Sequence, residues 1–244
     1  MAARSTGETA EQIPAAGALD LWSADLPEGT ELLRAQAATL AVDERERAAR
    51  FRVAAGRDRF IAARGFLRAV VATYLGLRPQ AVPLRAGAHG KPELEAGALA
   101  FNLAHAGNVA VCVVARDGVA VGIDTERIAP MRDADGAARL MMSAGELSRL
   151  DALPPPDRLR RLYETWTCKE AVLKAVGTGL DRPLDAFEIL FEPCGPPRIG
   201  DLEPGSTLAA RYWLRRFEPA AGFAGAVASS EPIARIRYRH WSWW

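Results

Sequence analysis

Two acidic residues end an apolar stretch of the chain with a spacing suited to binding a metal ion. Asp124 and Glu126 close the run VAVGIDTE, and residues i and i+2 of a β-strand lie on the same face. Neighbouring carboxylates repel each other unless a cation lies between them. Mg²⁺ favours such oxygen ligands together with substrate phosphates and water. The alternative is a strand end that reaches solvent, with Arg127 as an ion-pair partner.

A second group of reactive side chains lies in the segment WTCKEAVLK, residues 166–174. Glu170 and Lys174 are one helical turn apart, and such a pair on a surface is worth only ~0.2–0.5 kcal/mol. Trp166 lies on the same face, and a large aromatic side chain seldom lines a fully solvated face. We therefore expect this face to meet another part of the protein. If it meets Asp124, carboxylates and a lysine converge in an arrangement suited to a metal-bound diphosphate.

Lysine is rare in this chain. Only Lys91, Lys169 and Lys174 are lysines among the 31 basic residues, and lysine differs from arginine in being a compact point charge. These three positions are therefore candidates for chemistry, with chance on a solvated helix face as the alternative. His105, which ends FNLAHA, is by itself more often structural, but with Lys91 on the HGKP turn it could donate to a phosphate.

Arginines are concentrated in residues 45–68, where eight of them accompany two acids, Glu46 and Asp58. Apolar residues alternate with the arginines, which predicts an amphipathic helix with one buried side. The arginines are either its solvated face or an electropositive wall for a phosphorylated ligand.

The elements that must position these residues can be predicted from local signals. In the first half, a helix is predicted over 57–76, ended by Gly76. Asp117-Gly118 separates two apolar runs within 109–126 and predicts a β-hairpin. A first strand is expected at 20–27, and a turn that leads into an extended piece is expected at 89–94.

In the second half, Ser143 and Glu146 have the spacing of a capping box. A long helix is predicted over 157–177, capped by Asp157 and ended by Gly177. Helices mixed with antiparallel strands give an α+β fold. The remaining segments predicted as strands are FEILFE, LAARYWLRRF, FAGAVASS and ARIRYRHW.

Composition limits the class of protein. The 244 residues are 49% hydrophobic, enough for a sizeable core, and no apolar run is long enough to predict a membrane span. A small, polar start without a secretory signal and three widely spaced cysteines predict a reducing, cytoplasmic location. The net charge of +1 argues against a nucleic-acid binder. We expect a disordered segment at 1–17 and two α+β subdomains at 18–117 and 118–244.

Together these motifs resemble the signature of the Sfp-type 4'-phosphopantetheinyl transferases. VGIDTE and WTCKEAVLK, with 41 residues between Asp124 and Trp166, are similar to that family's two central motifs. GKP at 90–92 and FNLAHA are similar to its upstream elements, in the same order. Ala104 departs from the pattern, because the family commonly has serine there, whose hydroxyl contacts the ligand's phosphate.

The resemblance implies a pseudo-twofold fold of two similar α+β subdomains with coenzyme A in the cleft between them. It implies transfer of the 4'-phosphopantetheine arm to a serine of an apo acyl or peptidyl carrier protein, with release of 3',5'-ADP, by a monomer. Mg²⁺, or Mn²⁺ in its place, would be held by Asp124, Glu126 and Glu170. Glu170 would also be the base, and Lys174 would neutralise the diphosphate. The residues implied for ligand binding are Arg59, Arg64, Lys91, Pro92, His105 and Lys169.

Two other functions are open at this point. A metal-dependent nuclease or phosphodiesterase also uses acids and a lysine around Mg²⁺, but would need a continuous basic surface, against which the net charge argues. A non-catalytic coenzyme-A-binding protein would need neither three carboxylates nor a divalent ion. The carrier protein served cannot be predicted from these residues.

Overall fold

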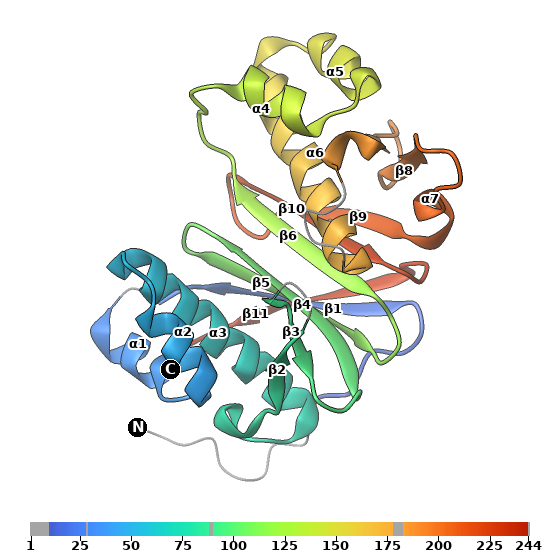
Figure 1. Ribbon diagram of the computed structural model, residues 1–244. Coiled ribbons are helices and arrows are strands. Elements are labelled where there is room, and N and C mark those ends of the chain that lie inside the picture. Colours follow the sequence, from blue (N-terminus) through green and yellow to red (C-terminus); the bar gives the residue numbers. More distant parts are fainter. Residues whose placement is uncertain (1–9, 28, 88–89, 178–182, 244) are drawn as a thin grey trace.

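The computed structural model describes residues 10–27, 29–87, 90–177 and 183–243, and Figure 1 shows them as two lobes. The N-terminal lobe is built on a four-stranded sheet in the order β11-β1-β5-β4. Its elements are β1 (Ala18–Asp25), α1 (Thr30–Ala37), α2 (Val42–Ala49), α3 (Ala54–Leu75), β2 (Leu84–Ala86), β3 (Pro92–Leu94), β4 (Leu99–Ala106), β5 (Val109–Arg116) and β11 (Arg235–Trp241).

The C-terminal lobe is built on a three-stranded antiparallel sheet in the order β6-β10-β9. A two-stranded ladder of β7 and β8 lies beside it. Its elements are β6 (Val121–Arg127), α4 (Ala134–Met141), α5 (Ala144–Asp151), α6 (Pro155–Val176), β7 (Phe187–Leu190), β8 (Arg198–Asp201), α7 (Leu208–Arg211), β9 (Trp213–Phe217) and β10 (Phe223–Ser229).

The two sheets pack on each other, and one long helix covers the outer face of each (Figure 1). The sequence of strand β5 is apolar throughout because both faces of the strand are buried. Val111 and Val113 pack against the strands of the second sheet, whereas Cys112 and Val114 on the other face pack under α3. A strand buried on both faces loses the alternation of polar and apolar residues. The predicted α+β class is confirmed, and the fold has four layers in the order helix, sheet, sheet, helix.

The two long helices, α3 and α6, have 22 residues each and end as predicted. Gly76 and Gly177 follow them with φ angles of 63° and 83°, a left-handed conformation that glycine adopts without steric cost. The predicted cap of α6 at Asp157 is wrong. This helix begins at Pro155, because proline at the first helical position lacks only an N–H that would have no partner.

The predicted hairpin at Asp117-Gly118 is also wrong. The chain does turn there, with Gly118 at φ 78°, but β5 pairs with β1 and β4 whereas β6 pairs with β10. The turn therefore passes the chain from one sheet to the other. The hairpin that does form joins β4 to β5 through Gly107-Asn108, where Ala106 lies opposite Val109.

Near the C-terminus, the strand over 235–241 returns to the first lobe. This strand, β11, pairs in parallel with β1 rather than with the strands of the second sheet, although the division at 117 assigns it to the C-terminal half. The segment LAAR, predicted as part of a strand, is the short helix α7. Trp241 and Trp243 of the aromatic C-terminus pack into the core beneath α3.

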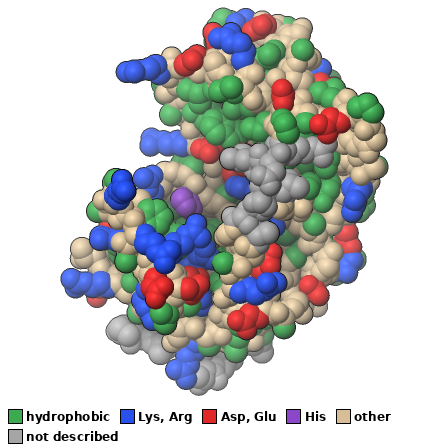
Figure 2. Space-filling view, viewed as in Figure 1, with side chains coloured by type: hydrophobic (Ala, Val, Ile, Leu, Met, Phe, Trp, Pro, Cys, Tyr) green, Lys and Arg blue, Asp and Glu red, His purple; other side chains and the backbone are tan. Residues whose placement is uncertain are grey.

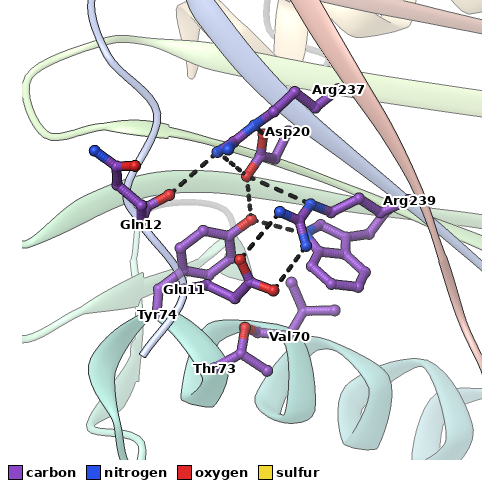
Figure 3. A network of polar contacts seen from close by, with 9 residues as sticks. Glu11, Gln12, Asp20, Val70, Thr73, Tyr74, Arg237 and Arg239 are labelled. Atoms are coloured by element: carbon purple, nitrogen blue, oxygen red, sulfur yellow. Dashed lines mark hydrogen bonds and ion pairs between the residues drawn. The ribbon is translucent and has the colours of Figure 1, made fainter. Parts of the chain in front are cut away.

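A network of polar side chains ties this strand to the rest of the N-terminal lobe (Figure 3). The fully buried carboxylate of Asp20 accepts hydrogen bonds from the Tyr74 hydroxyl at 2.5 Å and from Arg237. Arg239 binds both carboxylate oxygens of Glu11. The predicted disorder of 1–17 is therefore wrong for its second part, because residues 10–17 pack on the lobe. Residues 1–9 lie outside the described residues.

The capping box of α5 is confirmed. The Ser143 hydroxyl accepts from the Glu146 amide, and the Glu146 carboxylate accepts from the Ser143 amide. Within the described part of the chain, no helix combines the length and apolar character needed to cross a membrane.

Candidate active site

The site lies where β4, at the edge of the first sheet, meets β6, at the edge of the second. The two edges are joined by the buried side chain of Asn102, whose Oδ1 accepts a hydrogen bond from the Ile123 amide at 2.8 Å. Because Ile123 precedes Asp124, this bond fixes the strand beside the predicted acidic pair. The motif FNLAHA marks His105 as a candidate, but no pattern in the sequence indicates a role for Asn102.

Helix α6 approaches β6 closely because the strand has a glycine at the point of contact. A Cβ added to Gly122 would lie 2.1 Å from the Ala171 carbonyl oxygen and 2.4 Å from the Ala175 amide. Only a residue without a side chain leaves room for this helix. The contact brings Glu170 and Lys174 to the end of the strand that carries Asp124.

These side chains line one open hollow of about 360 Å³ between the lobes. Figure 2 shows the notch between the lobes, with Lys and Arg side chains on both rims. The Trp166 ring, stacked on Tyr163, forms part of the wall. The predicted convergence of the acidic strand and the WTCKEAVLK helix is thus observed. The lining residues are Leu103, Ala104, His105, Asp124, Glu126, Trp166, Glu170 and Lys174.

The buried carboxylate of Asp124 is only half satisfied. Its Oδ1 accepts a hydrogen bond from Lys174 Nζ at 2.6 Å, whereas its Oδ2 is buried without a hydrogen-bond partner. A buried carboxylate oxygen without a partner is costly, so this atom marks a place where a ligand atom would be stabilised.

Burial is the main cause of raised pKa values in the three carboxyl groups of the hollow. Burial raises the pKa of Glu126 to about 7, and the charges of Asp124 and Glu170 add to the effect. Burial also raises the pKa of Asp124 and of Glu170, while Lys174 opposes the shift in each. The single positive charge of Lys174 therefore does not offset the effect of burial on the three carboxyl groups.

The chemistry of this donor set fits a divalent cation with oxygen ligands. The Asp124 Oδ2 without a hydrogen-bond partner could be a ligand atom for such an ion, whose positive charge would offset the burial that disfavours an ionised Glu126. As the side chains lie, no three His, Cys, Asp or Glu residues of the described ranges are gathered closely enough to hold a metal by themselves. A bound ion would thus draw its remaining ligands from water or substrate.

Two of the residues expected to bind the ligand line a second, smaller cavity of about 70 Å³. Arg64 lies 3.5 Å from the Glu44 carboxylate but makes no hydrogen bond through its buried Nε. Pro92 also lines this cavity. Arg47 and Arg85, which the sequence analysis did not single out, also line this cavity. The density of arginines in 45–68 pointed to the region of Arg47 without giving a single position, and Arg85 lies outside that range.

His105 and Arg59 lie beside the main hollow. His105 lines it, and desolvation and the positive charges of Arg59 and Lys174 lower the pKa of its imidazole. Arg59 itself is exposed on α3, with its Nε donating to the Ala55 carbonyl oxygen. Both side chains are accessible to a ligand in the hollow.

Lys91 is bound to backbone instead of facing the hollow. Its ammonium donates to the Val121 and Lys174 carbonyl oxygens, at 3.2 and 2.8 Å. It thereby links the first lobe to both β6 and α6. Of the HGKP turn, residue 89 lies outside the described residues.

Lys169 does not contact the hollow, and the expectation that it binds the ligand is wrong. Its side chain is fully buried, and its ammonium lies 2.8 Å from the Glu146 carboxylate. The remaining protons go to the carbonyl oxygens of Leu184 and Phe187. The motif placed Lys169 next to Glu170 in sequence, but successive helix residues face different sides.

Comparison with known proteins shows the family to which the chain belongs. Residues 120–228 match the family model of the 4'-phosphopantetheinyl transferase superfamily, and residues 23–117 match a model of the 4'-phosphopantetheinyl transferase N-terminal region. The chain is 38% identical over 184 residues to the 4'-phosphopantetheinyl transferase HetI of Nostoc sp., covering 73% of this chain and 76% of that protein. The chain belongs to the 4'-phosphopantetheinyl transferase superfamily.

Other relatives of this transferase match more weakly. A putative 4'-phosphopantetheinyl transferase of Synechocystis sp. is 31% identical, over 65% of each protein. Among solved structures, the holo-acyl-carrier-protein synthase of Bacillus anthracis in complex with coenzyme A aligns with a TM-score of 0.38 and 19% identity, covering 45% of this chain and 93% of that one.

Proposed function

We propose that this transferase moves the 4'-phosphopantetheine arm of coenzyme A to a serine of an apo acyl or peptidyl carrier protein. The observation that carries the proposal is the single hollow in which Asp124, Glu126, Glu170 and Lys174 converge, with one carboxylate oxygen left unpartnered. Membership of the superfamily supports the same reaction.

Asp124, Glu126 and Glu170 are proposed to hold Mg²⁺, or Mn²⁺ in its place, once their side chains turn toward the ion, because they do not surround one point as they lie. When bound, the ion supplies positive charge to the diphosphate of coenzyme A. Lys174 supplies a further positive charge from its place one turn after Glu170, where its ammonium can reach a phosphate oxygen as well as Asp124.

The transfer itself is a phosphoryl-type displacement. The serine oxygen of the carrier bonds to the β-phosphorus, and the bond from that phosphorus to the oxygen of the leaving 3',5'-ADP breaks. Glu170 is the proposed acceptor of the serine proton, since burial raises the pKa of its carboxyl above the ordinary value and makes it a better base. Such reactions depend on positioning and charge neutralisation more than on covalent help from the enzyme.

The nucleotide part of coenzyme A is proposed to extend from the hollow over the first lobe. His105 and Arg59 adjoin the hollow, and Arg64 and Pro92 line the smaller cavity beyond, where Arg47 adds positive charge. Lys91 is proposed to support this region from beneath, because its protons are already directed to carbonyl oxygens. Ala104 lines the hollow with a methyl group, so the ligand receives no hydroxyl contact at that position.

The carrier protein is proposed to dock on α4, beside the mouth of the hollow. Met131, Ala134 and Trp166 pack in one cluster, which holds α4 against the pocket-lining face of α6. On the outer side of α4, Leu140 is 83% exposed and Arg139 lies next to it. An apolar side chain with a basic neighbour suits an acidic partner.

Mass spectrometry of apo carrier proteins tests the proposal. Each of a fatty-acid, a polyketide and a nonribosomal-peptide carrier is incubated with the protein, coenzyme A and Mg²⁺. We expect at least one to gain the mass of the phosphopantetheine arm, and to gain nothing in chelator or when its acceptor serine is replaced by alanine. Cleavage of nucleic acid without modification of any carrier would favour a nuclease, and binding of coenzyme A without transfer would favour a binding protein.

A further inference from the structure

Lys169 and Glu146 form a buried ion pair in which every polar atom is satisfied. The exposed fractions of the two side chains are 0% and 3%. The Lys169 ammonium has three protons and three acceptors, namely the Glu146 carboxylate and the carbonyl oxygens of Leu184 and Phe187. No donor of this lysine is left for a ligand.

The Glu146 carboxylate joins two further elements to the pair. One oxygen accepts from the Ser143 amide at the start of α5, at 2.8 Å. The other accepts from the Ile189 amide in β7, at 2.7 Å. The pair thus connects α5, α6 and β7, which are separate in sequence, through one point inside the C-terminal lobe.

The pair lies on the side of α6 away from the hollow. Lys169 directly precedes Glu170, and successive residues are about 100° apart around a helix. Anchoring Lys169 to α5 and β7 therefore determines the direction in which Glu170 points. On the opposite side, the backbone of α6 at Ala171 and Ala175 lies directly against Gly122 of β6.

We propose that the Lys169–Glu146 pair positions the catalytic helix, fixing the rotation of α6 about its axis so that Glu170 and Lys174 face Asp124. This inference rests on the proposed function. It reassigns Lys169 from a ligand of coenzyme A to a positioning residue. A buried ion pair adds little net stability compared with apolar side chains, and conformational specificity is one reason to retain it.

The test compares turnover in variants that lose the pair. The double variant Lys169→Met with Glu146→Gln removes both charges together, so we expect its stability to be closer to wild type than that of either single variant. If the pair positions Glu170, the folded double variant loses about 10- to 100-fold in kcat for carrier modification, while its KM for coenzyme A changes little. A merely structural pair would lower the melting temperature and leave kcat unchanged below it.

Tyr74→Phe is the matched control. It removes a hydrogen bond to the buried Asp20 carboxylate in the other lobe (Figure 3), so it should reduce stability without changing kcat. If the double variant does not fold, Lys169→Arg keeps the charge, but its longer planar group should displace α6 and lower kcat.

The possible results separate the two ideas. Wild-type kcat in the folded double variant, or in Lys169→Arg if the double variant does not fold, would overturn the positioning role and leave the proposed function intact. Absence of transfer by the wild-type protein itself would overturn both. A reduced kcat that Tyr74→Phe does not reproduce supports the positioning role.

Discussion

The ammonium of Lys174 lies 2.6 Å from Oδ1 of Asp124, while Oδ2 of the same carboxylate has no hydrogen-bond partner. The lysine comes from α6 and the aspartate from β6, so this contact joins the two elements that carry the motifs. It satisfies half of one carboxylate and leaves Glu126 and Glu170 with raised pKa values. The predictions for Asp124, Glu126 and Lys174 depend on this imbalance of charge.

Asp124→Asn and Glu126→Gln should each abolish transfer without unfolding the protein. Both changes keep the shape of the side chain and remove one carboxylate from the proposed metal site. Burial disfavours the charged form of both acids, so neutral side chains should leave the melting temperature unchanged or raise it in the absence of metal. Transfer rates and thermal unfolding in chelator measure the two effects.

Glu218→Gln is a suitable control, because Glu218 is an exposed acid whose only ion pair is a 4.0 Å contact with Arg160 among the described residues. It should change neither transfer nor melting temperature. A near-normal rate at low Mg²⁺ in Asp124→Asn or Glu126→Gln would remove that residue from the metal site.

Stability without metal should fall as the pH rises from about 4.5 to about 7. In this window the folded protein retains a proton on Glu126, whose pKa is about 7, whereas the unfolded chain has lost it at an ordinary value of 4.5. The state that binds more protons is favoured at low pH, so the folded state loses this contribution as the pH rises. A one-unit difference between folded and unfolded pKa corresponds to about 1.4 kcal/mol.

Denaturant unfolding in chelator at several pH values measures this slope. Glu126→Gln should flatten it, and Mg²⁺ should stabilise wild type more at pH 8 than at pH 5, because charged carboxylates bind the ion. Parallel curves for wild type and Glu126→Gln would contradict the shifted pKa.

The sequence predicted the site better than it predicted the strand pairing. The motifs gave Asp124, Glu126, Glu170 and Lys174 correctly as neighbours, because a strand face and a helix face each follow from residue spacing. The pairing of strands depends on contacts between distant segments. The Asp117-Gly118 turn therefore has the local sequence of a hairpin, although it joins two different sheets.

The remaining wrong predictions concern single residues whose burial depends on distant partners. Lys169 and Lys174 appear equivalent in WTCKEAVLK, yet one is fully buried against Glu146 and the other lines the hollow. Nothing local distinguishes them, since the partner glutamate is 23 residues away. Asn102 likewise has no local signal, because its role is a single hydrogen bond from the Ile123 amide in the other sheet.

Gly122→Ala should destabilise the protein strongly. The added Cβ would lie 2.1 Å from the Ala171 carbonyl oxygen, and the helix backbone must move to relieve the clash. Overpacking of this kind costs about 1–3 kcal/mol or more, and a protein of this size loses about 2–4 °C in melting temperature per kcal/mol. Transfer should also fall, since α6 carries Glu170.

Gly56→Ala provides the control for this substitution. Gly56 lies in the first turn of α3, where an added Cβ would meet only the Phe51 ring at 3.3 Å. Alanine there should be neutral or slightly stabilising, because it is the better helix former. Calorimetry on the two variants compares them directly, and equal melting temperatures would contradict the close approach at Gly122.

Docking of the carrier should weaken with salt and with the loss of Leu140. Leu140→Asp places a negative charge on the exposed apolar surface of α4 and should raise KM for an acidic carrier while leaving KM for coenzyme A unchanged. Salt should have the same effect on wild type through screening of the arginines. Exposed Leu202→Asp is the control. A carrier KM that is flat with salt and unaffected by Leu140→Asp would rule out this surface.

Lys174→Arg should be a poor replacement although it keeps the positive charge. The Lys174 ammonium is a compact group within 2.6 Å of Asp124 in a hollow that must also accept a diphosphate. A guanidinium spreads its charge over a larger plane and favours bidentate partners. We expect it to displace Glu170 or the diphosphate by about 1 Å, enough to cost ~100-fold in rate.

Arg198→Lys is the matched control, because Arg198 forms an exposed ion pair with Glu192 outside the hollow. Exchanging the two basic residues there should be silent, since exposed pairs contribute ~0–1 kcal/mol and either cation can form them. If Lys174 were only such a pair with Asp124, its exchange would be silent as well. Steady-state kinetics, with circular dichroism to confirm folding, distinguish the two cases by about two orders of magnitude in kcat, and wild-type turnover in Lys174→Arg would exclude contact between Lys174 and the reacting diphosphate.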